Sequence, residues 1–190
     1  MYYVIYTGSG NESRTELYIK KEIPAQYCQS CFYPQRHMKK KIRGKWTDYY
    51  ERLIPGYLFV QTDDAEGFYH ELKKYPLILK MLGQLDSREA KEGEIFLPLS
   101  PRDERWLAGI TGLPQKNVAA GGSEVHPIVE LSEVGFDEND EVVILSGPLT
   151  DLKGRVKKID LHRRIASVEV EFMGVKTDLH LGIELVGKTK

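Results

Sequence analysis

The chain has 190 residues, of which 27 are basic and 28 acidic, so its formal net charge is -1 when histidine is neutral. This balance excludes histone-like binding driven by bulk positive charge. With 41% hydrophobic and 10% aromatic residues, the chain has enough apolar material for one or two folded domains and is not intrinsically disordered.

The chain shows no pattern of secretion or membrane insertion. Residues 1–6 lack a basic run before an apolar stretch, and no apolar run approaches the roughly 18 to 20 residues of a membrane-spanning helix. Cys28 and Cys31 are too few for a four-ligand zinc site, and the Pro34 context disfavours a redox pair. We expect a cytoplasmic protein with two reduced structural thiols and no membrane contact.

Strand and helix patterns alternate over the first 110 residues. β-branched and aromatic residues predict strands over 2–7, 57–62 and 77–82. Apolar spacing and capping residues predict helices over 12–23, after Asp63–Asp64 and from Ser100–Pro101. The pattern predicts an α+β sandwich.

A basic hairpin is predicted between Arg36 and Arg52, which enclose seven basic and two acidic residues, counting both ends. Residues 43–45 form its tip, and Trp46 opens the returning strand. Cations beside aromatic rings favour nucleic-acid binding, in which the cations contact phosphates and the rings stack on unpaired bases. The alternative is a solvated hairpin whose lysines only protect an exposed sheet edge from pairing. The candidate contacts are Lys39, Lys40, Lys41, Arg43 and Lys45.

Residues 111–137 are rich in Gly, Pro and acids and are predicted to be a linker. Beyond them, short strands at 141–145, 154–159, 166–172 and 175–181 predict a small β-barrel. Met173–Gly174 is predicted to form a tight turn between the last two.

The barrel carries a second basic segment, between Lys153 and Arg164. Arg155 and Lys157 are predicted to share one face of a strand, because they flank Val156. Arginine forks suit phosphates and guanine edges, so RNA contact is favoured over an ordinary charged surface. The candidate RNA-binding residues are Lys153, Arg155, Lys157, Lys158, His162, Arg163, Arg164 and Lys176.

Enzymatic patterns are missing from the sequence. The five histidines show neither i,i+4 pairs nor metalloprotease spacing, and no serine lies in a nucleophile elbow. The Gly8–Ser13 turn lacks the third glycine and the distant acid of a dinucleotide loop. We therefore predict no catalytic residues, no metal and no cofactor.

Residues 54–60, Ile-Pro-Gly-Tyr-Leu-Phe-Val, follow the hairpin and complete a pattern over both halves of the chain. Together with the opening strand at 2–4, the turn at 10–12, Gly147–Pro148, Gly154–Val156 and residues 181–186, they resemble the NusG family of transcription elongation factors. The resemblance implies an NGN α/β sandwich at 1–110, with an antiparallel sheet flanked by helices, and an SH3-like KOW barrel at 138–190.

The resemblance also implies partners. The NGN domain is expected to bind the clamp helices of RNA polymerase, and the basic hairpin to face upstream or non-template DNA. The protein is expected to act as a monomer. The residues expected to bind polymerase are Tyr3, Tyr6, Leu53, Ile54, Pro55, Tyr57 and Phe59.

Two segments depart from the housekeeping pattern of the family, namely 76–83 and the basic stretch 159–166. Both are similar to LoaP-type paralogues, which are antiterminators of long operons, and this implies a nascent RNA hairpin as the KOW ligand. A housekeeping factor whose barrel binds ribosomal protein or Rho is the first alternative. A KOW-type ribosome component that binds rRNA is the second.

Overall fold

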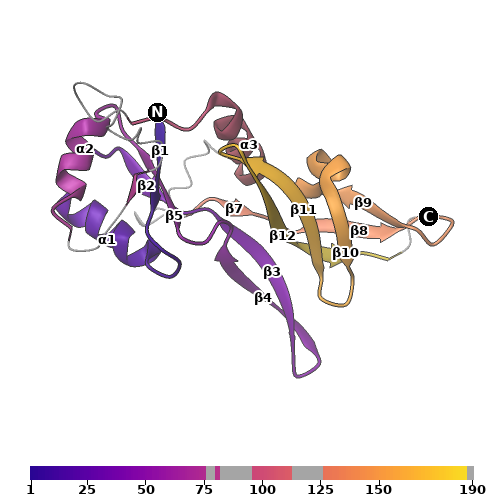
Figure 1. The fold of residues 1–190 in the computed structure, drawn as a ribbon. Helices are drawn as coiled ribbons and strands as arrows, with labels where there is room; N and C mark the ends of the chain where they lie inside the picture. Colours follow the sequence, from indigo (N-terminus) through magenta and orange to yellow (C-terminus); the bar gives the residue numbers. More distant parts are fainter. Residues whose placement is uncertain (76–79, 82–95, 113–125, 188–190) are drawn as a thin grey trace. The chain divides into compact units, whose positions relative to one another are not determined.

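The computed structural model describes residues 1–75, 80–81, 96–112 and 126–187 (Figure 1). The chain divides into two compact units, which are described separately. The first unit comprises residues 1–33 and 54–104, and the second comprises residues 34–53 and 105–190.

The first unit is an antiparallel sheet with two helices on one face (Figure 1). Its strands, in the spatial order β2, β5, β1 and β6, are Ser30–Phe32, Tyr57–Gln61, Tyr2–Tyr6 and Lys80–Met81. The helices are α1, Glu12–Glu22, and α2, Ala65–Leu72. Ile5, Ile19, Leu58 and Phe68 are fully buried in the core that sheet and helices share. The predicted α+β layer is confirmed.

Local hydrogen bonds explain where the helices begin. The Asp64 carboxylate accepts from Gly67 N at 2.8 Å and caps α2 as predicted. Asn11 stands at the N-cap of α1 but makes no side-chain cap bond, and its amide instead donates to Thr7 O at 3.1 Å. Helix α3, Pro101–Thr111, starts where Ser100 Oγ accepts from Asp103 N. Its residues from Arg105 onward belong to the second unit.

The second unit contains the predicted basic hairpin, formed by β3, Gln35–Ile42, and β4, Lys45–Arg52. Strand β7, Ile128–Val129, pairs with β3 in parallel. The hairpin contacts β12, Val175–Leu185, because Arg36 Nη1 donates to His180 O at 2.7 Å. The backbone of His37 also passes against Gly182, where a Cβ atom would not fit. The hairpin therefore clusters with the barrel residues, whereas the sequence grouped it with residues 1–110.

The barrel is a curled sheet in the order β10, β11, β12, β8 and β9 (Figure 1). These strands span Val156–Asp160, Ile165–Phe172, Val175–Leu185, Ser132–Phe136 and Val142–Ser146. Along β11, Val168, Val170 and Phe172 are buried and alternate with less buried residues, as the period of two predicts. Strand β8 joins β12 in parallel, with Ser132 opposite Ile183. The predicted small barrel is confirmed.

Some expected boundaries differ from the structure. The segment 148–155 is a 3₁₀ helix, η1, so the strand predicted from Gly154 begins at Val156. Arg155 therefore does not lie on a strand beside Lys157, which corrects that prediction. Strands β7 and β8 lie within the range predicted as linker, and residues 113–125 of that range lie outside the described residues. Of the strand predicted at 77–82, only Lys80–Met81 are described, and they form β6.

None of the helices in the described ranges has the length and apolar character needed to cross a bilayer. The same ranges contain no cluster of three or more side chains suited to hold a metal ion. In the described ranges neither cysteine forms a disulfide, and Cys31 is buried in the first unit.

Candidate protein- and nucleic-acid-binding surfaces

An aromatic patch lies at the end of the first unit's sheet. Tyr6 of β1 and Tyr57 of β5 are register partners whose ring centroids lie 5.3 Å apart. Tyr6 is 42% exposed and Tyr57 is partly exposed. Pro55, which precedes Tyr57 by two residues, is also exposed. Large aromatic groups that remain accessible beside a turn are typical of protein contact sites.

A buried carboxylate holds the turn beneath this patch. Glu12 is fully buried, and its Oε1 accepts from Gly56 N at 2.6 Å while its Oε2 accepts from Gly10 N at 2.9 Å. Gly56 has a φ of 91°, and its carbonyl accepts from Thr7 N at 2.8 Å. The side chain of Glu12 therefore ties two loops together and fixes the strand that carries Tyr57.

The remaining residues expected to bind polymerase are buried. Tyr3, Leu53, Ile54 and Phe59 each expose less than a tenth of their surface. Tyr3 belongs to the core cluster against the helices and lies on the opposite face of β1 from Tyr6, because side chains alternate along a strand. In this structure Tyr6, Pro55 and Tyr57 form the accessible part of the expected site, which we call the aromatic patch.

The tip of the basic hairpin is a two-residue turn, and Lys45, which was predicted to belong to the tip, is instead the first residue of β4 and pairs with Ile42. Arg43 and Gly44 have φ values of 49° and 82°. Positive φ at both central residues defines a type I′ turn, which matches the twist of the two strands. Lys41, Arg43 and Lys45 are exposed there. Three cations are thus gathered at one end of the ribbon.

Two lysines nearer the base of the hairpin are already engaged. Lys39 Nζ pairs with Glu184 and lies 3.4 Å from Asp48 Oδ1. The hydrogen bond to Glu184 raises the pKa of Lys39 above its ordinary value. Lys40 Nζ lies 4.9 Å from the ring centroid of Tyr49, in a cation–π contact. The cations at the hairpin tip are therefore more available to a ligand than Lys39 and Lys40.

The basic residues of the barrel also fall into two groups. Lys153, Lys158, His162 and Arg163 are exposed, and within the described residues their side chains make no ion pair. Arg164 is different, because its guanidinium lies 5.1 Å from the ring centroid of Trp46 on the hairpin. The exposed group defines what we call the cationic rim.

Lys157 and Lys176 are paired with acids from neighbouring strands. Lys157 Nζ lies 2.7 Å from Asp178 Oδ1 and 2.9 Å from Glu169 Oε2. Lys176 Nζ lies 3.6 Å from the other oxygen of Glu169. The hydrogen bond from Lys157 lowers the pKa of Glu169, and the bond to Asp178 raises the pKa of Lys157. This acidic neighbourhood weakens the attraction of these two lysines for phosphate.

We expect Lys157→Gln to raise the pKa of Glu169 toward its ordinary value of 4.5, because a shorter, neutral amide replaces the ammonium group that donates to that carboxylate. In the native chain the pair stabilises the fold above about pH 4.5. That stability disappears as the pH falls through the lower pKa of the folded state. Carbon-detected NMR titration of the Glu169 carboxyl measures the change. Lys153→Gln is the control, and an equal shift in that variant would contradict the assignment.

Two residues near these surfaces were not singled out by the sequence. Glu12 was placed in a turn and at the start of a predicted helix, but nothing in the sequence indicated that its carboxylate is buried. Trp106 of α3 faces Phe172 of the barrel, with ring centroids 5.4 Å apart. A tryptophan directly after an exposed arginine in a predicted helix, as in Arg105–Trp106, was the signal that could have found it.

A model of the family described as "Transcription termination factor nusG" matches residues 1–107, and a KOW motif model matches residues 138–171. The transcription termination/antitermination protein NusG of Thermus thermophilus is 26% identical over 197 residues, which cover 98% of this chain and 97% of that protein. The protein of the same name from Haemophilus influenzae is 24% identical, covering 98% and 93%.

A solved structure, titled "Domain interaction in Thermotoga maritima NusG", is similar in fold. Its TM-score is 0.50 at 20% identity, covering 95% of this chain and 92% of that one. The α/β unit and the curled barrel thus define a protein with an NGN domain and a KOW domain on one chain. Because the first family model matches more than half of the residues, the chain belongs to the NusG family of transcription termination/antitermination factors.

Proposed function

We propose that the chain is a specialised, LoaP-like antitermination factor that binds RNA polymerase through its NGN domain and nascent RNA through its KOW barrel. The observation that carries the proposal is the cationic rim, in which the side chains of Lys153, Lys158, His162 and Arg163 are exposed and make no ion pair with a described residue. Exposed lysine and arginine side chains supply the positive charge that a phosphate backbone requires. The factor is non-enzymatic.

Binding of the factor would change how much of the polymerase is in the elongating state and how much is paused. A factor that binds the closed, elongating clamp more tightly than the open or paused one shifts the equilibrium toward elongation by the difference in affinity. The RNA contact on the same chain makes the second binding event effectively intramolecular, which gives operon selectivity without strong affinity at either site. The exposed hairpin tip with Arg43 suits the non-template DNA strand.

The aromatic patch supports the polymerase contact, and its variants test it. We expect Tyr6→Ala combined with Tyr57→Ala to weaken binding of the full chain to core polymerase at least tenfold, because aromatic anchors commonly contribute about 2 kcal/mol or more. Biolayer interferometry measures the dissociation constant. The control is Leu17→Ala, which removes an apolar side chain that is 69% exposed on α1. Unchanged binding in the double variant would overturn this part.

The RNA contact is tested on the cationic rim. We expect Lys158→Ala combined with Arg163→Ala to weaken binding of hairpin RNA about tenfold and to flatten its salt dependence, since two phosphate contacts are lost. Lys21→Ala on α1, where the side chain is 82% exposed, is the control for the loss of a surface charge. Filter binding at several salt concentrations gives both quantities.

Each alternative predicts a different result in these assays. A housekeeping factor would bind polymerase, ignore RNA hairpins at every salt concentration and capture ribosomal protein or Rho through its barrel. A KOW-type ribosome component would bind rRNA and fail to co-purify with polymerase.

A further inference from the structure

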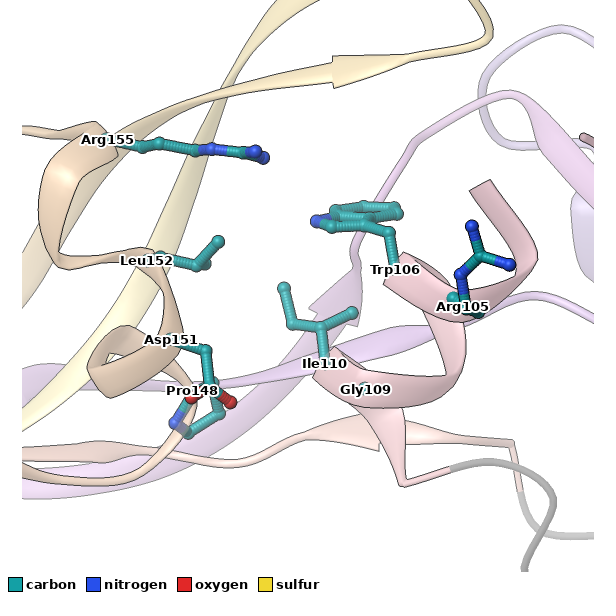
Figure 2. Close-up of a pocket in the computed structure, with 8 residues that line it drawn as sticks. All are labelled: Arg105, Trp106, Gly109, Ile110, Pro148, Asp151, Leu152 and Arg155. Carbon is teal, nitrogen blue, oxygen red and sulfur yellow. The ribbon is translucent and has the colours of Figure 1, made fainter. Parts of the chain in front are cut away.

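A groove in the second unit lies between the later residues of α3 and the 3₁₀ helix η1 (Figure 2). Its volume is about 230 Å³, below the roughly 300 to 1,000 Å³ of sites that enclose a whole small-molecule ligand. A single flat ring system fits such a space better than an entire cofactor. The lining residues are Arg105, Trp106, Gly109, Ile110, Pro148, Asp151, Leu152 and Arg155.

An unpaired hydrogen-bond donor faces this groove. Trp106 Nε1 is buried and has no acceptor among the described residues. Figure 2 shows the indole nitrogen directed from α3 toward the side that carries Leu152 and Arg155. A buried donor without an acceptor is unfavourable, because it has given up its hydrogen bonds to water without replacing them. A ligand that brings an acceptor into the groove would recover that free energy.

The walls of the groove suit a planar ring. Ile110 and Leu152 are buried, and their side chains extend into the space as an apolar floor (Figure 2). Arg155 is exposed and extends over the same space from the end of η1. Its guanidinium has no ion pair within the described part of the chain, so its flat face is available for stacking.

The charge around the groove favours a polyanion. Arg155 follows Lys153 by two residues and precedes Lys158 by three, and both lysines belong to the cationic rim. Arg105 and Arg155 outnumber Asp151 among the charged lining residues. The phosphate next to an inserted base would therefore meet positive charge, whereas a basic peptide would be repelled.

We infer that this groove receives one unpaired base of the RNA bound by the barrel, a conclusion that rests on the proposed RNA contact. A carbonyl oxygen or ring nitrogen of the base accepts from Trp106 Nε1. One face of the base stacks on the Arg155 guanidinium, and the other contacts Ile110 and Leu152. Unpaired bases that leave the stack and insert beside arginine are a common basis of RNA specificity.

The test compares hairpin RNAs that differ at one bulged position. One set of probes carries each of the four bases there, and the matched probe carries an abasic sugar, which keeps the charge and shape of the backbone. For the full chain we expect at least one of the four base-carrying probes to bind at least fivefold tighter than the abasic probe. This ratio corresponds to the lower end of the free energy that stacking of one base contributes. Trp106→Phe, which keeps a ring but removes the N–H, and Arg155→Ala should each bring this ratio close to one.

Arg163→Ala serves as the matched control, because it should weaken all probes equally and leave the ratio unchanged. In a Trp46→Phe background Trp106 is the sole indole of the chain, so its fluorescence reports occupancy of the groove directly. If the probes that carry a base and the abasic probe bound with equal affinity, and the Trp106 emission did not change, the inference would be overturned. A peptide carbonyl would then be favoured as the acceptor. Failure to bind any hairpin would instead overturn the proposed RNA function itself.

Discussion

Gly147→Ala should destabilise the barrel by about 3 kcal/mol, because both the backbone and the surrounding space exclude a side chain. Gly147 has φ 88° and ψ -173°, a region that is essentially restricted to glycine. A Cβ atom would lie 2.7 Å from Ser132 Cα and 2.8 Å from Leu131 O, and backbone atoms move aside only at high cost. Urea unfolding of the full chain, followed by the NMR signals of β11, measures the loss.

The control for this variant is Gly154→Ala at the other end of η1. Nothing described lies within 4 Å of a Cβ atom at Gly154, and its φ lies outside the left-handed region. We expect a change within about 0.5 kcal/mol, as at most surface positions. Equal stability of the two variants would contradict the steric explanation for Gly147.

Glu12→Gln should lower the free energy of unfolding of the first unit by about 2 kcal/mol, the typical value of a hydrogen bond to a buried charged group. The carboxylate accepts from both Gly56 N and Gly10 N. An amide has one oxygen acceptor, so its NH₂ group would face one of these donors. The turn that fixes Tyr57 would shift, and we expect polymerase affinity to fall together with stability. Thermal unfolding and the interferometry assay measure the two effects.

Glu22→Gln is the matched control at the far end of the same helix. That carboxylate is exposed and lies 3.3 Å from Lys21 Nζ, an arrangement that contributes little to stability. It should leave both unfolding and polymerase binding unchanged. A Glu12 variant as stable as the Glu22 variant would show that the buried carboxylate does not hold the turn.

Features set by neighbours in the sequence were predictable. The turns at Arg43–Gly44 and Met173–Gly174 have positive φ at both positions, as short loops between paired strands require. The Asp64 cap follows from local chemistry in the same way. The burial alternation of β11 follows from the period of two. Each of these features depends on a few residues that are adjacent in the chain, so it can be predicted without knowing which distant segments pack nearby.

Features that join distant strands were not predictable. Lys157 counts as a free cation in the sequence, yet Asp178 and Glu169 reach it from two other strands. The burial of Phe59 on the face shared with Tyr57 depends on what packs against the sheet, which strand periodicity does not specify. Tyr3 is different, because alternation alone separates it from Tyr6 and a stricter reading of the strand would have found this.

The parallel pairing of β8 with β12 determines where a fragment that contains the whole barrel must begin. Strand β8 lies between β12 and β9 in the sheet. A fragment that starts at residue 138 would lack β8, so β12 and β9 would each have an unpaired edge. Such a fragment would aggregate or pair with a second copy. A fragment for crystallisation should begin ahead of Ser132, upstream of the boundary that the KOW motif alone would suggest.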